Sequence, residues 1–405
     1  MAISVEEALG LIYSHAKSLG TEIIPIENSL GRVLAEDITA LYCLPPYDNS
    51  AMDGYAVSIS DAGKTLKQSC TIFAGDKDEI RLVEEQCIRI MTGAKIPQGC
   101  EAIVPIEEVS VVNEQVTLPT SIKASAHIRL KGEDIQAGAL LLTRGTLLYA
   151  HHITLLASQG ITHVSLFQRP KVALFASGNE LKMHYERIES HQLYNTNTPT
   201  FVARAEELGC DVLFSGTAED TMESIQSHIK STLNADFIIT SGGVSVGDAD
   251  FTKEAFRSLG LETLFESVEI KPGKPTTFGR IGNTLILNLP GNPLAAALCF
   301  ELFAQSTILS LSGRNDKYIN TISTVMGSPF TMKKGRRSLI PGWFNGESFT
   351  PSEKFAPGMV LPLSRANAFM MVDASVEGFE QGSSVKIIPT RWCMSSEVQK
   401  SLITF

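Results

Sequence analysis

A glycine-rich turn between a predicted strand and a predicted helix is the segment of this chain best suited to binding an anion. Its sequence is Ile239-Thr-Ser-Gly-Gly-Val-Ser-Val-Gly-Asp-Ala-Asp-Phe-Thr252. Gly242, Gly243 and Gly247 allow backbone amides to turn toward a phosphate, and the N-terminus of the following helix adds partial positive charge. We therefore predict a phosphate-binding turn at this position.

Carboxylates near this turn change the chemistry that it would support. Asp248 and Asp250 would repel a bare phosphate, but they suit one bridged by Mg²⁺, which prefers carboxylate and phosphate oxygens. The alternative, that one of them only caps the helix, stays open. Glu180, in Ser177-Gly-Asn-Glu-Leu181, and Asp220, after the next predicted strand, would add carboxylates to the same edge of the fold. Such a group suits metal binding or proton transfer, although exposed loop acids are often only solvated.

Two lysines lie three residues apart in Lys271-Pro-Gly-Lys-Pro-Thr-Thr277. Pro272 and Pro275 restrict the backbone, so that both ammonium groups, Lys271 and Lys274, can be directed at one polyanion. This pattern predicts a clamp for a phosphate or an oxyanion, with an exposed basic turn as the alternative. A second loop, Leu289-Pro-Gly-Asn-Pro293, is explained without a binding role if Asn292 caps a helix that begins at Pro293.

The elements that position these segments alternate between strand and helix from residue 171 onward. We predict strands at 172–176, 212–215, 237–240 and 284–289, and helices at about 199–208, 222–233, 250–259 and from 293. This alternation is typical of a parallel sheet covered by helices on both faces. Ligands of such sheets lie beyond the carboxyl ends of the strands, where the glycine turn and the carboxylates would meet.

The remaining chain predicts smaller, mostly β-rich parts. Ser4 would cap an N-terminal helix, residues 56–138 contain short apolar runs separated by Gly and Pro, and the chain past 317 suits a small β-barrel. We predict a multidomain protein, α/β plus β, with these divisions: 1–45 with 139–169 as an N-terminal part, 46–138 as a β-rich insertion, 170–316 as the α/β domain and 317–405 as the barrel.

Composition excludes several classes of partner. The formal charge of −10 over 405 residues disfavours binding to nucleic acid or to an anionic membrane. The seven cysteines contain no Cys-x-x-Cys pair, which favours a reducing cytosol over a zinc or disulfide framework. The apolar stretch from Leu294 to Leu311 is interrupted by Glu301 and Gln305, so we expect a buried helix. We expect a soluble cytoplasmic protein.

Taken in order, six motifs closely resemble the MoeA family, which includes the homologous domain of gephyrin. These motifs are Asp48-Asn-Ser-Ala-Met-Asp-Gly-Tyr-Ala56, Met91-Thr-Gly-Ala94, Gly132-Glu-Asp-Ile135, Ser241-Gly-Gly-Val-Ser-Val-Gly247 with Asp250, Lys271-Pro-Gly-Lys-Pro275 and Leu289-Pro-Gly-Asn-Pro293. The resemblance spans nearly the whole chain. It implies a homodimer of four-domain subunits, in which residues 1–45 with 139–169 form a linker and dimerisation domain. The cleft would lie between the α/β domain of one subunit and the smaller domains of the other.

The resemblance also implies a reaction and its participants. Adenylyl-molybdopterin and molybdate would give molybdenum cofactor, AMP and water, with Mg²⁺ required, and contacts with the molybdopterin adenylyltransferase and recipient molybdoenzymes would follow. The implied catalytic residues are Asp53, Asp134, Glu180, Asp220 and Asp250, of which Asp220 and Asp250 would bind the metal. The implied substrate-binding residues are Thr92, Ser241, Gly242, Gly243, Ser245, Lys271, Lys274, Pro290 and Pro293.

The sequence also departs from the family pattern. Asn179 and Asn195 stand where aspartate is common, and Pro362 and Ala368 replace a serine and a glycine in the C-terminal part. Two alternatives therefore remain: a molybdopterin adenylyltransferase, which resembles the α/β domain alone, and a catalytically impaired scaffold of the same family. The long N-terminal region argues against the first, and retention of Asp53, Asp250 and both lysines argues against the second.

Overall fold

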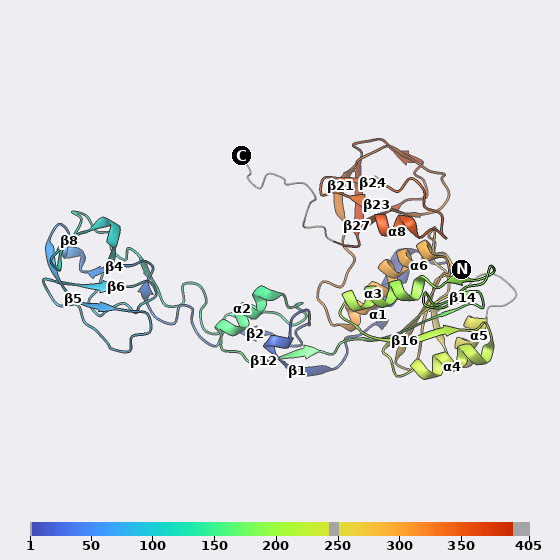
Figure 1. Cartoon of the computed structure of the whole chain (residues 1–405), viewed down its shortest axis with the longest axis horizontal. Coiled ribbons are helices and arrows are strands. Elements are labelled where there is room, and N and C mark those ends of the chain that lie inside the picture. The colour runs from blue at the N-terminus through green and yellow to red at the C-terminus, as the bar shows by residue number, and fades with distance from the viewer. Residues whose placement is uncertain (1, 243–250, 392–405) are drawn as a thin grey trace. The chain divides into compact units, whose positions relative to one another are not determined.

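The computed structural model describes residues 2–242 and 251–391, and its internal contacts divide the chain into two compact units. Unit 1 comprises Met1–Ala35, Gly145–Ile153 and His163–Phe405, and unit 2 comprises Glu36–Arg144 and Thr154–Thr162. The finer division into four domains remains a prediction. Figure 1 shows the helices and strands of both units.

Unit 1 contains a six-stranded sheet in the order β16-β13-β17-β20-β19-β18. Its strands are β13 (Lys171–Ser177), β16 (Asp211–Ala218), β17 (Phe237–Ser241), β18 (Glu262–Phe265), β19 (Thr277–Ile281) and β20 (Thr284–Leu289). The first four in spatial order are parallel, which confirms the predicted α/β sheet. The last two pair antiparallel, and the sequence did not predict them.

Helices cover both faces of this sheet, as predicted (Figure 1). They are α1 (Val5–His15), α3 (Asn197–Glu207), α4 (Met222–Thr232), α5 (Phe251–Ser258), α6 (Pro293–Cys299) and α7 (Gln305–Leu311). Alternate strand residues separate the two faces: Leu174 and Ile239 pack in the core that includes α1, α3, α6 and α7, whereas Phe175 and Ile238 pack in the core that includes α4 and α5.

The helix that starts at Pro293 is a core element. A π-helical segment, Phe300–Ala304, joins α6 to α7, and the whole run Pro293–Leu311 is apolar and long enough to cross a bilayer, yet 83% of it is buried in the protein. Glu301 accepts hydrogen bonds from Nε and Nη2 of Arg204, both at 2.8 Å. This pair ties α3 to the helix, and the expectation of a buried helix is confirmed.

Unit 1 also contains the N-terminal helix α1 and a C-terminal β-barrel. The N-terminal helix has the predicted cap, because the Glu7 N–H donates to Ser4 Oγ at 3.1 Å and the Glu7 carboxylate accepts from the Ser4 N–H at 2.8 Å. The C-terminal part is the predicted barrel, closed in the order β21-β24-β23-β25-β27. Its strands are β21 (Ile322–Met326), β23 (Ser338–Phe344), β24 (Ser348–Pro351), β25 (Ala368–Val372) and β27 (Ser384–Pro389), with α8 (Leu361–Arg365) between β24 and β25.

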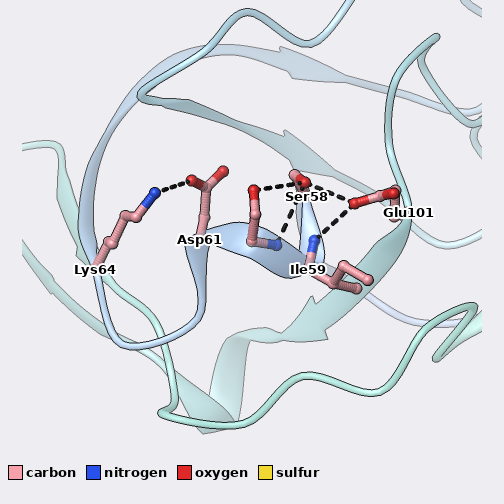
Figure 2. A network of polar contacts seen from close by, with 6 residues as sticks. Ser58, Ile59, Asp61, Lys64 and Glu101 are labelled. Carbon is pink, nitrogen blue, oxygen red and sulfur yellow. Dashed lines mark hydrogen bonds and ion pairs between the residues drawn. The ribbon is translucent and has the colours of Figure 1, made fainter.

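Unit 2 is β-rich, as expected. Its main sheet runs β7-β4-β6-β5-β9-β8, formed by β4 (Gly54–Val57), β5 (Thr65–Ile72), β6 (Gln86–Ile90), β7 (Ala102–Pro105), β8 (Ser110–Val112) and β9 (Gln115–Thr117). Figure 2 shows how the turn after β4 is fixed: the Glu101 carboxylate accepts from Ser58 Oγ at 2.6 Å and from the Ile59 N–H at 3.0 Å, and Lys64 pairs with Asp61 at 2.8 Å.

The remaining elements are short. They are the pairs β1 (Thr21–Pro25) with β12 (His163–Phe167), β2 (Ile38–Thr39) with β11 (Leu140–Leu142), β3 (Asn49–Ser50) with β10 (Ile128–Arg129), β14 (Leu181–Lys182) with β15 (Leu193–Tyr194) and β22 (Phe330–Thr331) with β26 (Gly378–Phe379), together with helix α2 (Ala150–Ser158) and three short 3₁₀ turns.

The end of β17 passes very close to the end of β13. Gly242 has a φ of +101°, and a Cβ atom built there would lie 2.4 Å from the backbone oxygen of Ser177. The Gly242 N–H donates to the Leu289 carbonyl at 3.3 Å, which joins the turn to the end of β20 as well. Only glycine fits this approach without strain, so the local geometry of the turn depends on it.

Replacing Gly242 with alanine should lower the free energy of unfolding by about 1–3 kcal/mol, because the added methyl group meets backbone and the φ angle disfavours it. Gly291→Ala is a matched control at the neighbouring strand end, since a Cβ there would meet only Gly242 Cα, at 3.6 Å. Thermal denaturation followed by circular dichroism measures both. Equal melting temperatures for Gly242→Ala and the unaltered protein would contradict the steric argument.

Candidate functional site

The ends of β13, β17 and β20 meet at a cavity of about 730 Å³ in unit 1. We call it the sheet-edge cavity. It is lined by Ser177, Gly178, Glu180, Leu181, Leu193, Tyr194, Asn195, Thr196, Asn197, Asp220, Ser241, Gly242, Pro275, Pro290, Gly291, Asn292, Pro293, Gly358 and Val360. The predicted residues Glu180, Asp220, Ser241, Gly242, Pro290 and Pro293 therefore line one cavity, at the edge where ligands of parallel sheets bind.

The floor of the cavity is held together by Asn197, which the sequence analysis did not single out. Its Nδ2 donates to Ser241 Oγ at 2.6 Å and to the Gly291 carbonyl at 2.8 Å, and Ser241 Oγ donates to the Pro290 carbonyl at 3.3 Å. Asn197 begins α3, and its side chain is buried. One amide thus links a helix start to the ends of two strands.

The acidic side of the cavity consists of Glu180 and Asp220. Partial burial raises the pKa of Asp220, and the negative charge of Glu180 adds to the rise, whereas a backbone hydrogen bond from Asn179 lowers it. Two carboxylates facing one cavity are hard oxygen donors of the kind that hold Mg²⁺ together with substrate phosphates. No cluster of three potential metal ligands occurs among residues 2–242 and 251–391. The donor set fits Mg²⁺ bound by one or two carboxylates.

Two departures from the family pattern have structural explanations. The Asn179 Oδ1 accepts the Asp220 N–H at 3.0 Å, a contact that needs an acceptor but no charge. Asn195 is buried, and its Oδ1 accepts the Thr198 N–H at 3.1 Å while its Nδ2 donates to Thr198 Oγ1 at 2.9 Å. Asparagine therefore stabilises both turns without adding negative charge to the rim.

The two lysines do not share the sheet-edge cavity. Lys274 lines a second cavity of about 410 Å³, with Ala2, Ser4, Val268, Glu269, Ile270, Gly335, Arg336, Arg337, Asp373 and Ala374. We call it the basic cavity, because three cationic side chains meet there. Pro275, the next residue in the chain, lines the sheet-edge cavity. One short segment thus contributes to both cavities.

Lys271 lines neither cavity, although its backbone is fixed beside them. Its N–H donates to the Arg337 carbonyl and its carbonyl accepts from the Leu339 N–H, both at 2.8 Å. Gly273 has a φ of +115°, and a Cβ there would lie 2.3 Å from Cys299 Sγ. The lysine segment is therefore held rigidly against the barrel and α6, as its two prolines predicted.

The C-terminal part contains a cluster of basic residues, Lys333, Lys334, Arg336 and Arg337, which is partly neutralised by ion pairs. Arg337 Nη1 pairs with the Glu6 carboxylate at 2.6 Å, and Lys334 pairs with Glu377 at 3.0 Å. Arg336 lines the basic cavity with Lys274. This part of the chain does contribute to the cavities, because Gly358 and Val360 line the sheet-edge cavity. Pro362 lies in the first turn of α8 and is buried, and Ala368 is buried in the barrel core, so both of these residues contribute to packing.

Unit 2 brings together two more predicted residues. Asp53 Oδ1 accepts the Thr92 N–H at 2.8 Å and Thr92 Oγ1 at 2.9 Å, and these hydrogen bonds lower the pKa of Asp53. The aspartate therefore stays ionised at neutral pH, and Thr92 fixes its direction. Asp134 is exposed, and its N–H donates to the Leu44 carbonyl at 3.0 Å.

Five predicted residues of the glycine turn lie outside the described residues. They are Gly243, Ser245, Gly247, Asp248 and Asp250. Their predicted roles in phosphate or metal binding remain predictions. Described residues on either side of the turn are fixed: Ser241 ends β17, and Thr252 Oγ1 on α5 lies 3.1 Å from Ser177 Oγ.

Three models of known families match successive parts of the chain. The MoeA N-terminal region (domain I and II) matches residues 3–160, the probable molybdopterin binding domain matches 173–310, and the MoeA C-terminal region (domain IV) matches 324–390. The middle match covers the residues that form the sheet-edge cavity between β13 and α6.

Full-length relatives agree with these matches. A molybdopterin molybdenumtransferase of Staphylococcus aureus (strain COL) is 31% identical over 400 residues, 96% of this chain and 96% of the relative. One of Staphylococcus epidermidis (strain ATCC 12228) is 31% identical over 423 residues, 99% and 98% of the two chains. The crystal structure of a molybdopterin biosynthesis MoeA protein from Pyrococcus horikosii has a TM-score of 0.83 at 30% identity, covering 97% of this chain and 100% of that one. The chain therefore belongs to the MoeA family of molybdopterin molybdenumtransferases, enzymes of molybdenum cofactor biosynthesis.

Proposed function

We propose that this enzyme inserts molybdate into adenylyl-molybdopterin and releases AMP, in a reaction that requires Mg²⁺. The observation that carries the proposal is the pair of cavities joined by the Lys274-Pro275 segment. One has carboxylates at a parallel sheet edge, and in the other three cations outnumber the two acids Glu269 and Asp373. A nucleotide-linked pterin and an oxyanion need separate sites of this kind, close enough for their reacting groups to meet.

In this proposal the sheet-edge cavity binds the adenylylated pterin. Ser241 and Gly242 would face its phosphates, and Gly243 and Ser245 would extend the same turn. Pro290 and Pro293 shape the wall beside Asn197. Mg²⁺ held by Asp220 and Asp250 would neutralise the phosphate oxygens and the charge that develops when AMP leaves. Partial burial and then the nearby charge of Glu180 raise the pKa of Asp220. Glu180 itself, at the same rim, is the carboxylate that we propose for proton transfer.

The basic cavity suits molybdate, a tetrahedral dianion. Lys274, Arg336 and Arg337 supply positive charge against the acids Glu269 and Asp373, which also line the cavity. Because Arg337 is already paired with Glu6, Lys274 and Arg336 would make the charge-assisted contacts with the anion. Lys271 lies at the other end of the same rigid segment and would raise the local positive potential. We propose that unit 2 takes part in the same reaction through Asp53, Thr92 and Asp134.

The cellular setting is also part of the proposal. We propose a cytoplasmic homodimer that receives its substrate from the molybdopterin adenylyltransferase and delivers cofactor to recipient molybdoenzymes, with no nucleic acid or membrane partner. The acidic formal charge of −10 and the burial of the apolar helix Pro293–Leu311 support this setting.

The purified protein should release AMP from adenylyl-molybdopterin only when Mg²⁺ and molybdate are both present, because charge on the leaving phosphate needs the metal and the dithiolene needs the oxyanion. Chromatographic quantification of AMP, with sulfate in place of molybdate as the control, measures this. Binding of adenylyl-molybdopterin without molybdate-dependent release would indicate the impaired scaffold, and ATP-dependent adenylylation of molybdopterin would indicate the adenylyltransferase.

Lys274→Ala should raise the KM for molybdate about tenfold or more, because a charge-assisted contact in the basic cavity is lost. The KM for adenylyl-molybdopterin should change less. Lys230→Ala removes an exposed lysine from α4 and serves as the control. Steady-state AMP release at varied molybdate measures both variants. An unchanged molybdate KM in Lys274→Ala would contradict the assignment of the basic cavity.

The acid limb of the profile of kcat/KM against pH should shift when the charge beside Asp220 is changed. Its pKa is raised, and the ionised form is the one that binds Mg²⁺, so activity is present above this pKa and is lost as the pH falls through it. Asn179→Asp adds a negative charge next to Asp220, so the acid limb of kcat/KM should move to higher pH.

Asn283→Asp, in the exposed turn between β19 and β20, makes the same charge change away from the cavity. It should leave the acid limb of the profile in place. A profile that is unchanged in Asn179→Asp, or that moves to lower pH, would show that Asp220 does not control this limb.

A further inference from the structure

The two-stranded sheet of β14 and β15 positions one acidic residue, Glu180, and one aromatic residue, Tyr194, of the sheet-edge cavity. Strands β14 and β15 pair in parallel, with Lys182 opposite Tyr194. The Leu193 N–H donates to the Glu180 carbonyl and the Asn195 N–H donates to the Lys182 carbonyl, each at 2.8 Å. Glu180 and Tyr194 are therefore fixed relative to each other by backbone hydrogen bonds.

Tyr194 contributes an exposed aromatic ring to a cavity that is otherwise polar around Asn197. It is 42% exposed although it lines the cavity, and its hydroxyl donates to the Glu186 carbonyl at 3.3 Å. The backbone hydrogen bonds of Leu193 and Asn195, on either side of Tyr194, fix its Cα beside the cavity, and the hydroxyl contact adds a smaller restraint on the ring. An exposed aromatic ring held in this way offers a face for a planar ligand.

Apolar neighbours extend this face. Leu193 is 63% exposed and Val360 is 47% exposed, and both line the cavity, as does the half-buried Leu181. Val360 comes from the C-terminal part of unit 1, so two distant segments of the chain supply apolar surface to one cavity. The polar floor around Asn197 and the acids Glu180 and Asp220 lie in the same cavity. It therefore offers an apolar surface and a charged surface to the same ligand.

We propose that Tyr194 stacks against a planar heteroaromatic ring of the bound substrate and so determines its specificity. This inference rests on the proposed function, which supplies a substrate with two such rings, the pterin and the adenine. Stacking on the fixed tyrosine ring would place the charged phosphates toward the acids and their metal. Loss of the ring would weaken ligands that carry a heteroaromatic ring and leave ring-free phosphates unaffected.

The test measures binding of three probes by isothermal titration calorimetry in Mg²⁺: AMP, 6-hydroxymethylpterin and ribose 5-phosphate. Tyr194→Leu should weaken binding of AMP or of the pterin about tenfold, the usual size of one stacking contact, with ribose 5-phosphate unchanged. Tyr194→Phe keeps the ring and loses only the hydroxyl contact with Glu186, so its affinities should stay within about twofold of those of the unaltered protein.

Tyr185→Leu is the matched control, because Tyr185 is 72% exposed in the segment between β14 and β15 and does not line the cavity. A loss confined to AMP assigns the adenine to Tyr194, and a loss confined to the pterin assigns the pterin. Equal loss for ribose 5-phosphate, no loss for either ring-bearing probe, or no binding of either by the unaltered protein would overturn the proposal.

The test of the stacking contact and the test of the proposed reaction can fail independently. Normal molybdate-dependent AMP release together with unchanged binding in Tyr194→Leu would refute the stacking contact alone. Ring-dependent binding without AMP release would refute the reaction and leave the contact standing. Circular dichroism melting of each variant checks that Tyr194→Leu remains folded.

Discussion

The parallel register of β13, β17 and β20 is the constraint on which the site depends. Because these strands pair in register, their following turns emerge at one edge, and residues far apart in the sequence meet there. Parallel register alone does not fix the turns. The Asn197 amide does so, by donating to both Ser241 and Gly291, and Gly242 allows the turn after β17 to approach Ser177 without a Cβ in the way.

Charge is divided between two cavities. Glu180 and Asp220 lie at the sheet edge, and Lys274 and Arg336 lie in the neighbouring cavity. The basic cavity is not purely cationic, because Glu269 and Asp373 also line it and Arg337 pairs with Glu6. The rigid segment from Lys271 to Pro275 joins the two cavities, and its backbone is held by Arg337, Leu339 and the close approach of Gly273 to Cys299. This arrangement supports the proposed reaction between a metal-bound nucleotide and an oxyanion.

Most of the architecture could be predicted from the sequence, because the strands and helices of the α/β part have strong hydrophobic patterns and turns with specific residues. The cap at Ser4 and the buried helix from Pro293 were also predictable. Strands β18 and β19 were not: β19 begins inside the lysine segment, whose prolines and charges mask a strand signal.

Asn197 was missed because a buried asparagine at a helix start resembles an ordinary cap. The lysines were expected to act together, yet Lys274 lines the basic cavity and Lys271 does not, since side-chain direction in an irregular loop cannot be inferred from spacing.

The location of the bound nucleotide tests the central claim most directly. A crystal structure of the protein with AMP, Mg²⁺ and molybdate should show AMP in the sheet-edge cavity, with its phosphate beside Ser241 and Gly242 and the metal at Asp220, and molybdate beside Lys274. Density for AMP outside that cavity, with the carboxylates of Glu180 and Asp220 left without a ligand, would contradict the account.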